Sequence, residues 1–242
     1  MSDPRDPRDP RRQQSVAVAL PVESLGADAR SSFLVRTYLH LYGAIVAFTL
    51  LETFLFVTGL ARVIALAMLG TSWLVVLGGF VIVSWIASHV AHRTESLGAQ
   101  YAALTVYVVA EAIVFVPLLY IAEFFAPGAI TSAAVVTLLG FGLLTGMALW
   151  TRQDLSFLGG ILRWAFAVAL MLIVAATVFG FQMGPIFSVA MVGLAGAAIL
   201  YDTSKVLHHY PEDRYVAAAL ELFASVALMF WYVLRLFLAS RR

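Results

Sequence analysis

Two acidic residues near the end of the chain form the pattern best suited to chemistry. Asp202 and Glu221 stand in successive apolar stretches on either side of the polar, proline-containing segment 207–213, which predicts the turn of a helical hairpin. Because that turn lies midway between them, antiparallel helices would carry both carboxyls to one depth, on the order of 13–15 Å from the turn. Ser225 follows one helical turn after Glu221, on the same face.

Two carboxyls at one depth in a low-dielectric bundle cannot both be ionised cheaply, so we expect this pair to take up and release a proton. When deprotonated, Asp202 and Glu221 would attract a hard cation, and calcium is the metal ion we expect there. Alternatives stay open for each acid. Asp202 would instead be a structural acid that is hydrogen-bonded or compensated by Lys205. Glu221 would instead be protonated or face water.

Further polar residues interrupt the apolar stretches. Glu52 and Glu111 are each interpreted either as a protonated helix contact or as part of a polar pathway, because an acid at the bilayer centre costs about 2.5–3.5 kcal/mol. His89, His92 and Glu95 recur every three residues, a spacing that metal sites use. We interpret them instead as a polar cap at the membrane interface.

The elements that position these residues are predicted to be membrane helices. The chain is 62% hydrophobic and only 12% charged, with a mean hydropathy of +0.93, whereas soluble domains are roughly half apolar and a quarter charged. Seven apolar stretches are each near the ~20 residues that cross the hydrocarbon core. We therefore predict an all-α, polytopic bundle of seven transmembrane helices over residues 31–242. The expected helices are Tyr38–Leu60, Trp73–Ala91, Tyr101–Ala122, Ala129–Trp150, Leu158–Phe181, Ile186–Leu207 and Tyr215–Phe237.

The N-terminal region differs in composition from the rest of the chain. A threefold Asp-Pro-Arg repeat occupies residues 3–11, and proline at every third position forbids a helix, so residues 1–30 are predicted to be a disordered cytoplasmic tail. With the N-terminus inside, eleven Lys and Arg residues lie on the cytoplasmic side and four outside. This distribution predicts an external C-terminus. The small-residue pairs Gly142/Gly146 and Gly193/Ala197 predict close helix contacts.

Composition also excludes several function classes. The chain has no cysteine and a net charge of +1, which argues against thiol chemistry and against a nucleic-acid partner. Tyr201-Asp202 matches half of the intramembrane aspartyl protease pattern, but the Gly-Xaa-Gly-Asp half is absent from the sequence. We therefore expect no enzymatic activity and no cofactor, with calcium only as a permeant ion.

Three segments together resemble one known family. They are Phe33–Tyr38, Thr151–Gly160 (with Asp-Leu-Ser-Phe-Leu-Gly-Gly) and Ala198–Val206 (Ala-Ile-Leu-Tyr-Asp-Thr-Ser-Lys-Val). They resemble the Bax inhibitor family, in its bacterial YccA-like branch, and the resemblance extends over residues 33–238. It implies seven helices, a cytoplasmic N-terminus and no enzymatic activity.

The resemblance also implies a function. The family is associated with proton-sensitive calcium leak, and in leak-type members two aspartates in the last two helices share a proton. Asp202 matches the first of these, whereas the second falls at Ser225, so we infer that Glu221 takes its place. Such members also pair the sensor with an arginine of the second helix, for which Arg93 is the nearest candidate.

We therefore expect an integral protein of the bacterial inner membrane that passes or regulates calcium in a proton-dependent way, with Asp202 as the central residue. Some bacterial members of the family instead bind and restrain a membrane-anchored AAA protease, so a modulator that conducts nothing is the main alternative. A third possibility is a small-molecule transporter that uses Glu52 and Glu111.

Overall fold

The computed structural model describes residues 21–24 and 26–240, and its regular elements in these ranges are all helical. The Asp-Pro-Arg repeat and Arg241 and Arg242 lie outside the described residues. The elements are η1 (Val22–Ser24), α2 (Ala27–Val57), α3 (Leu60–Leu69), α4 (Trp73–Arg93), α5 (Leu97–Phe125), α6 (Ala129–Thr151), α7 (Leu158–Phe179), α8 (Pro185–His208), η2 (Glu212–Arg214) and α9 (Tyr215–Ser240).

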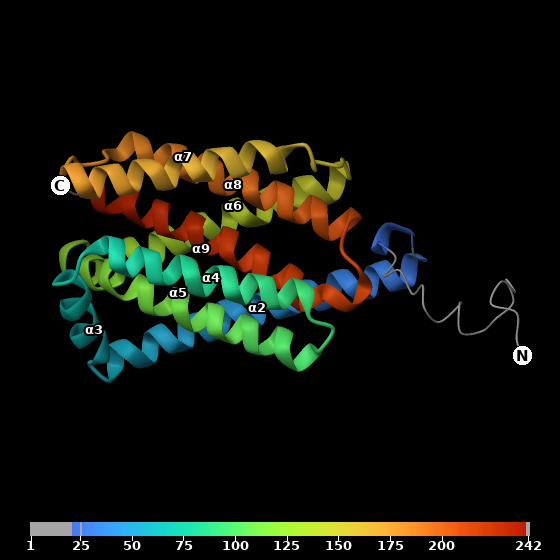
Figure 1. Ribbon diagram of the computed structural model, residues 1–242, viewed down its shortest axis with the longest axis horizontal. Helices are drawn as coiled ribbons and strands as arrows, with labels where there is room; N and C mark the ends of the chain where they lie inside the picture. Colours follow the sequence, from blue (N-terminus) through green and yellow to red (C-terminus); the bar gives the residue numbers. More distant parts are fainter. Residues whose placement is uncertain (1–20, 25, 241–242) are drawn as a thin grey trace, which may run out of the picture.

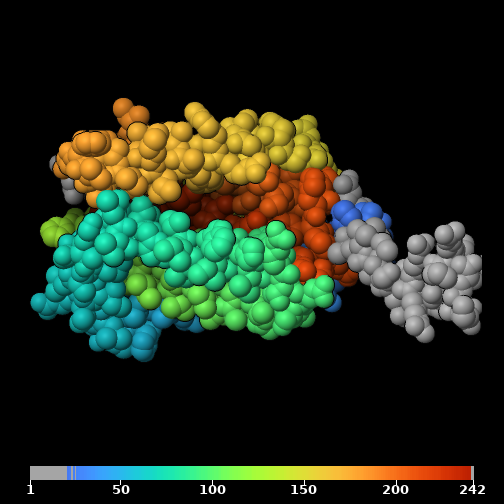
Figure 2. Space-filling model, viewed as in Figure 1, coloured from blue at the N-terminus to red at the C-terminus, as the bar shows by residue number. Residues whose placement is uncertain are grey.

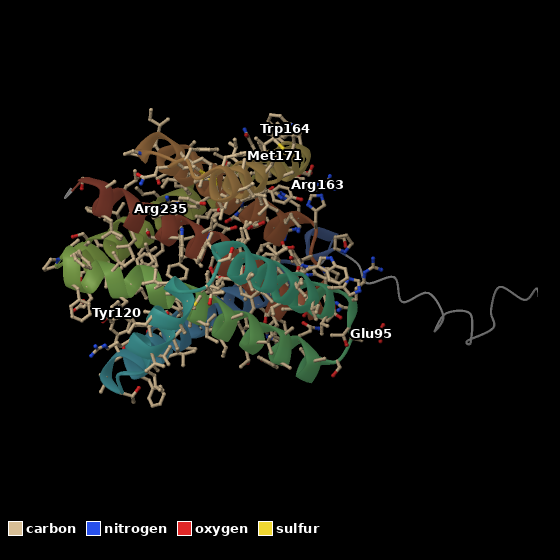
Figure 3. The ribbon with its side chains drawn as sticks, turned by 60° about the vertical axis from the view of Figure 1, so that its left-hand side comes forward. Glu95, Tyr120, Arg163, Trp164, Met171 and Arg235 are labelled. Atoms are coloured by element: carbon tan, nitrogen blue, oxygen red, sulfur yellow. The ribbon has the colours of Figure 1, made fainter. Side chains whose placement is uncertain are left out.

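Seven of these helices are long and apolar enough to cross a bilayer, which confirms the predicted all-α bundle. They run alternately in opposite directions along one axis (Figure 1). Their outer faces carry large apolar side chains, including Trp164 and Met171, which lie on the outer side of α7 (Figure 3). Apolar side chains on the outside of a bundle are stable in lipid, and the chain is therefore an integral membrane protein.

Helix α9 forms the centre of the bundle. It contacts α2, α4, α5, α6 and α8, and Figure 1 shows it between α8 above and α4 below. The consecutive residues Ala217, Ala218 and Ala219 are fully buried, because their small side chains let neighbouring backbones approach from several sides. Polar residues on α9 therefore face protein instead of lipid.

The first helix begins earlier than predicted. Ala27 starts α2, and Val22 before it is completely buried, so the predicted disordered tail extends too far at its C-terminal end. The sequence prediction also missed α3. Gly59 has φ of +78°, a conformation that glycine adopts without strain, and it lets the chain turn from α2 into α3. The ten residues of α3 extend about 15 Å, which is too short to span the membrane.

The predicted small-residue contacts are wrong. A Cβ atom added at Gly142, Gly146 or Gly193 would have no heavy atom within 4 Å. Other helical glycines face a neighbouring helix instead. A Cβ at Gly196 would lie 3.3 Å from Leu144 Cδ1, and one at Gly159 would lie 2.7 Å from the Tyr201 hydroxyl. The sequence spacing identified small residues, whereas the rotation of each helix decides which of them face a neighbour.

These contacts generate a test of the packing. Gly196→Leu should lower the midpoint of thermal unfolding in detergent, because the added side chain must displace Leu144; overpacking of this kind typically costs about 1–3 kcal/mol. Gly142→Leu, the same substitution at an exposed position, should leave the midpoint within experimental error. Equal effects of the two substitutions would contradict this packing.

Candidate functional site

The hairpin of α8 and α9 positions the candidate site. Helix α8 ends at His208, and its C-cap residue His209 donates its backbone N–H to the Lys205 carbonyl at 2.8 Å. Pro211 stops further helix, and η2 leads directly into α9 at Tyr215. The predicted hairpin turn is confirmed, and it brings polar residues of both helices together.

Asp202 lies in this hairpin opposite Ser225, not opposite Glu221. The Ser225 hydroxyl donates a hydrogen bond to Asp202 Oδ2 at 2.5 Å, and both side chains are more than nine-tenths buried. The equal-depth prediction for Asp202 and Glu221 is therefore wrong by about one helical turn. Asp202 stands six residues before the end of α8, whereas Ser225 stands ten residues after the start of α9, so the arms of the hairpin are unequal.

Glu221 lies one turn nearer to the hairpin turn and is paired with two basic side chains. Its Oε2 accepts from Lys205 Nζ at 2.7 Å, and its Oε1 lies 2.9 Å from His92 Nε2. Each of the three side chains is about a quarter exposed. Lys205 therefore compensates Glu221 directly, and of the two alternatives for Asp202 the structure shows the hydrogen-bonded acid. Neither carboxyl depends on the other for its hydrogen bonds.

His92 is a site residue that the sequence analysis assigned only to a polar cap. Its Nδ1 lies 2.7 Å from the Ser88 carbonyl oxygen, which can only accept, so Nδ1 carries a proton. Its Nε2 contacts the Glu221 carboxylate, another acceptor, so the geometry suits an imidazolium that donates from both nitrogens. Arg93, the predicted partner from the second long helix, is exposed. The basic partner from α4 is therefore His92 at the preceding position.

Tyr210 covers the cluster at the hairpin turn. Its hydroxyl lies 2.9 Å from His92 Nε2, and Lys205 Nζ lies 5.3 Å from the centre of its ring, within range of a cation–π contact. Burial, and next the nearby charge of Glu221, raise the pKa of Tyr210 well above its usual value. The phenol therefore stays neutral and acts only through hydrogen bonding.

Two connecting segments close this end of the bundle. Val22 donates its backbone N–H to the Tyr210 carbonyl at 2.9 Å, and Phe33 stacks on the Tyr210 ring with centroids 6.4 Å apart. On the other side of α8, the Ser204 hydroxyl accepts from Leu155 N at 2.8 Å. In that segment the backbone N–H of Ser156 lowers the pKa of the Asp154 carboxyl. The segment 151–160, which resembles the family, is thus hydrogen-bonded to α8 at Ser204, two positions after Asp202.

The other predicted pathway residues are not part of this cluster. Glu52 on α2 and Glu111 on α5 are buried, and within residues 21–24 and 26–240 Glu52 Oε1, Glu52 Oε2 and Glu111 Oε2 have no hydrogen-bond partner. Among the same residues, no group of three His, Asp or Glu side chains is arranged to hold a metal ion. Calcium prefers six to eight oxygen ligands, so the proposed binding of calcium by Asp202 and Glu221 stays a prediction.

The surface of the bundle has a hollow over part of α9. Figure 2 shows α9 at the base of this hollow, with α4 on one side and α7 on the other. His92, Lys205 and Glu221 come from α4, α8 and α9 respectively, and each side chain is partly exposed. The cluster therefore joins three helices.

The ion pair predicts a non-additive effect on stability. Lys205→Met should lower the free energy of unfolding by about 1–3 kcal/mol, because Glu221 would keep a poorly solvated charge; partial exposure reduces the larger cost typical of fully buried pairs. The double variant Lys205→Met/Glu221→Gln should recover part of this loss. Thermal unfolding of both single variants and the double variant tests the coupling, and additive effects would contradict it.

Comparison with known proteins agrees with this architecture. The family described as "Inhibitor of apoptosis-promoting Bax1" has a model that matches residues 30–242. A curated protein of Pseudomonas aeruginosa, the uncharacterised protein PA2604, is 35% identical over 111 residues, which are 45% of this chain. The matched segment spans about half the length of that relative (49%). Because the family match extends over nearly the whole described bundle, the chain belongs to the Bax inhibitor family.

Proposed function

We propose that this protein is a non-enzymatic regulator of calcium flux across the bacterial inner membrane, and that protons control the flux through the cluster around Glu221. The observation that carries the proposal is the pairing of Glu221 with both His92 and Lys205, which connects α4 to the α8–α9 hairpin. Asp202 lies one turn deeper on the same hairpin. A cation that crosses the bundle here would meet its carboxyl next.

His92 is the group that makes the cluster sensitive to protons in the physiological range. An ordinary imidazole titrates near pH 6.5. When His92 loses its proton, Nε2 no longer donates to Glu221, and the contact between α4 and α9 weakens. Lys205 still holds Glu221 on α8, so the expected movement is that of α4 away from the hairpin, which opens access to Asp202.

The count of Lys and Arg residues supports a location of this cluster at the cytoplasmic side, where α2 begins. In that orientation the imidazolium of His92 would respond to cytoplasmic pH. Its protonated state closes the path, and a rise in pH through the imidazole range opens it.

The presence of a serine at position 225, where leak-type members have an acid, favours a second candidate function. With a hydroxyl facing Asp202, the hairpin cannot form the two-aspartate pair that leak-type members are expected to use. A modulator of a membrane-anchored AAA protease needs no such pair. Copurification with a protease, together with absence of calcium flux, would favour this alternative.

The role of Asp202 is tested by calcium flux into dye-loaded liposomes that contain the purified protein. Asp202→Asn should reduce the flux at least tenfold, because the amide does not offer a negative charge to the cation. Glu111→Gln, which neutralises a buried acid outside the cluster, should retain most of it. Flux that is absent from the unsubstituted protein, or unchanged in Asp202→Asn, would remove the leak proposal.

The role of His92 is tested by the pH profile of the same flux between pH 6 and pH 8. The unsubstituted protein should conduct more as the pH rises, whereas His92→Gln should conduct at a nearly constant level. His89→Gln is the matched control, because His89 lies one turn away and stacks on Trp85. A profile that His92→Gln leaves unchanged would show that another group senses the proton.

A further inference from the structure

A cavity on another part of the bundle has features of a ligand site. It has a volume of about 430 Å³ and lies between α2 and α6, with α5 and α9 forming its base. Cavities of ~300–1,000 Å³ are typical of small-molecule sites. Its lining contains none of His92, Asp202, Lys205, Glu221 or Ser225, so it is separate from the ion-pair cluster.

Two buried polar side chains without a hydrogen-bond partner among the described residues belong to the lining of this cavity, one on α2 and one on α6. Glu52 on α2 is only 6% exposed, and neither of its carboxyl oxygens has a hydrogen-bond partner among the described residues. Thr137 on α6 is 2% exposed, and its hydroxyl is also unpartnered there. A buried polar group without a hydrogen bond costs about 1–3 kcal/mol, more when it is charged. A ligand that bonds to both groups would remove this cost.

The remaining lining shows what kind of ligand would fit. Phe48, Phe56, Phe223 and Phe230 are among the lining residues. Of the described residues in the lining, only the acids Glu52 and Glu123 are ionisable. Acidic groups without a basic neighbour favour a cation, and aromatic faces attract one further. The same aromatic side chains would also pack against an alkyl chain.

The hydrogen-bonding groups of the lining limit which kind of cation would bind. A carboxylate only accepts hydrogen bonds, and a threonine hydroxyl can accept as well, so the ligand must bring N–H donors. A quaternary ammonium has none. A phospholipid with an amine head group also carries a phosphate, which the two acids would repel.

We propose that the cavity between α2 and α6 binds an amphiphilic primary amine, with its ammonium group between Glu52 and Thr137 and its alkyl chain among the phenylalanines. This site goes beyond the proposed calcium function and does not depend on it. The amine is a free amphiphile that enters from the bilayer, because Leu138 and Val57 at the cavity are exposed on the outside of the bundle.

The test uses the whole protein in phosphatidylcholine nanodiscs, with thermal unfolding measured against increasing octylammonium. A ligand that binds the folded state raises its unfolding temperature with concentration. We expect Glu52→Gln to weaken octylammonium binding at least tenfold, whereas Glu111→Gln, the same change at a buried acid outside the cavity, leaves it unchanged. Thr137→Val should weaken binding by a smaller factor.

Two comparisons separate site binding from general partition into the bilayer. Octanoate and octyltrimethylammonium should bind at least tenfold more weakly than octylammonium. The acids repel the octanoate anion, and octyltrimethylammonium has no N–H to donate in a hydrogen bond. Ala134→Phe, which fills the cavity and keeps both polar groups, should abolish the shift even if Glu52→Gln does not fold. Equal shifts in the unsubstituted protein, Glu52→Gln and Ala134→Phe, or equal binding of octyltrimethylammonium, would overturn the proposal.

Discussion

The cost of a carboxylate in hydrocarbon is the constraint on which the organisation of this bundle depends. Glu221 stands on the central helix, where lipid cannot solvate it, and it is held by a lysine from α8 and a histidine from α4. Each basic partner comes from a different helix, so the same charge that needs compensation also ties three helices together. Asp202 differs from Glu221 in that its hydrogen-bond partner is a neutral group, the Ser225 hydroxyl.

The central position of α9 is what makes this arrangement possible. A run of fully buried alanines near its start lets five helices approach it, and polar residues one turn further along then face protein on several sides. Tyr210, Val22 and Phe33 close the same end by packing on the hairpin turn. The ion pair between His92 and Glu221 thus joins the α8–α9 hairpin to α4.

The buried acids of this protein fall into two groups with different uses. Glu221 has partners of opposite charge, which compensate its carboxylate directly. Glu52 has no such partner among the described residues and belongs to the lining of an apolar, aromatic cavity, where we propose that it binds an ammonium group. The cost of an acid in a membrane bundle is thus met by ion pairs at Glu221, whereas at Glu52 no described side chain offsets it.

The sequence by itself determined the seven membrane helices, the hairpin between α8 and α9, and the family, because hydropathy, length and local motifs are properties of single segments. It did not determine that Glu221 faces Lys205 and His92, that Ser225 faces Asp202, or that Gly196 rather than Gly142 lies at a contact. Those facts depend on the rotation and relative shift of packed helices. A shift of one turn moves a side chain by about 5 Å, and only the packing of the whole bundle decides it.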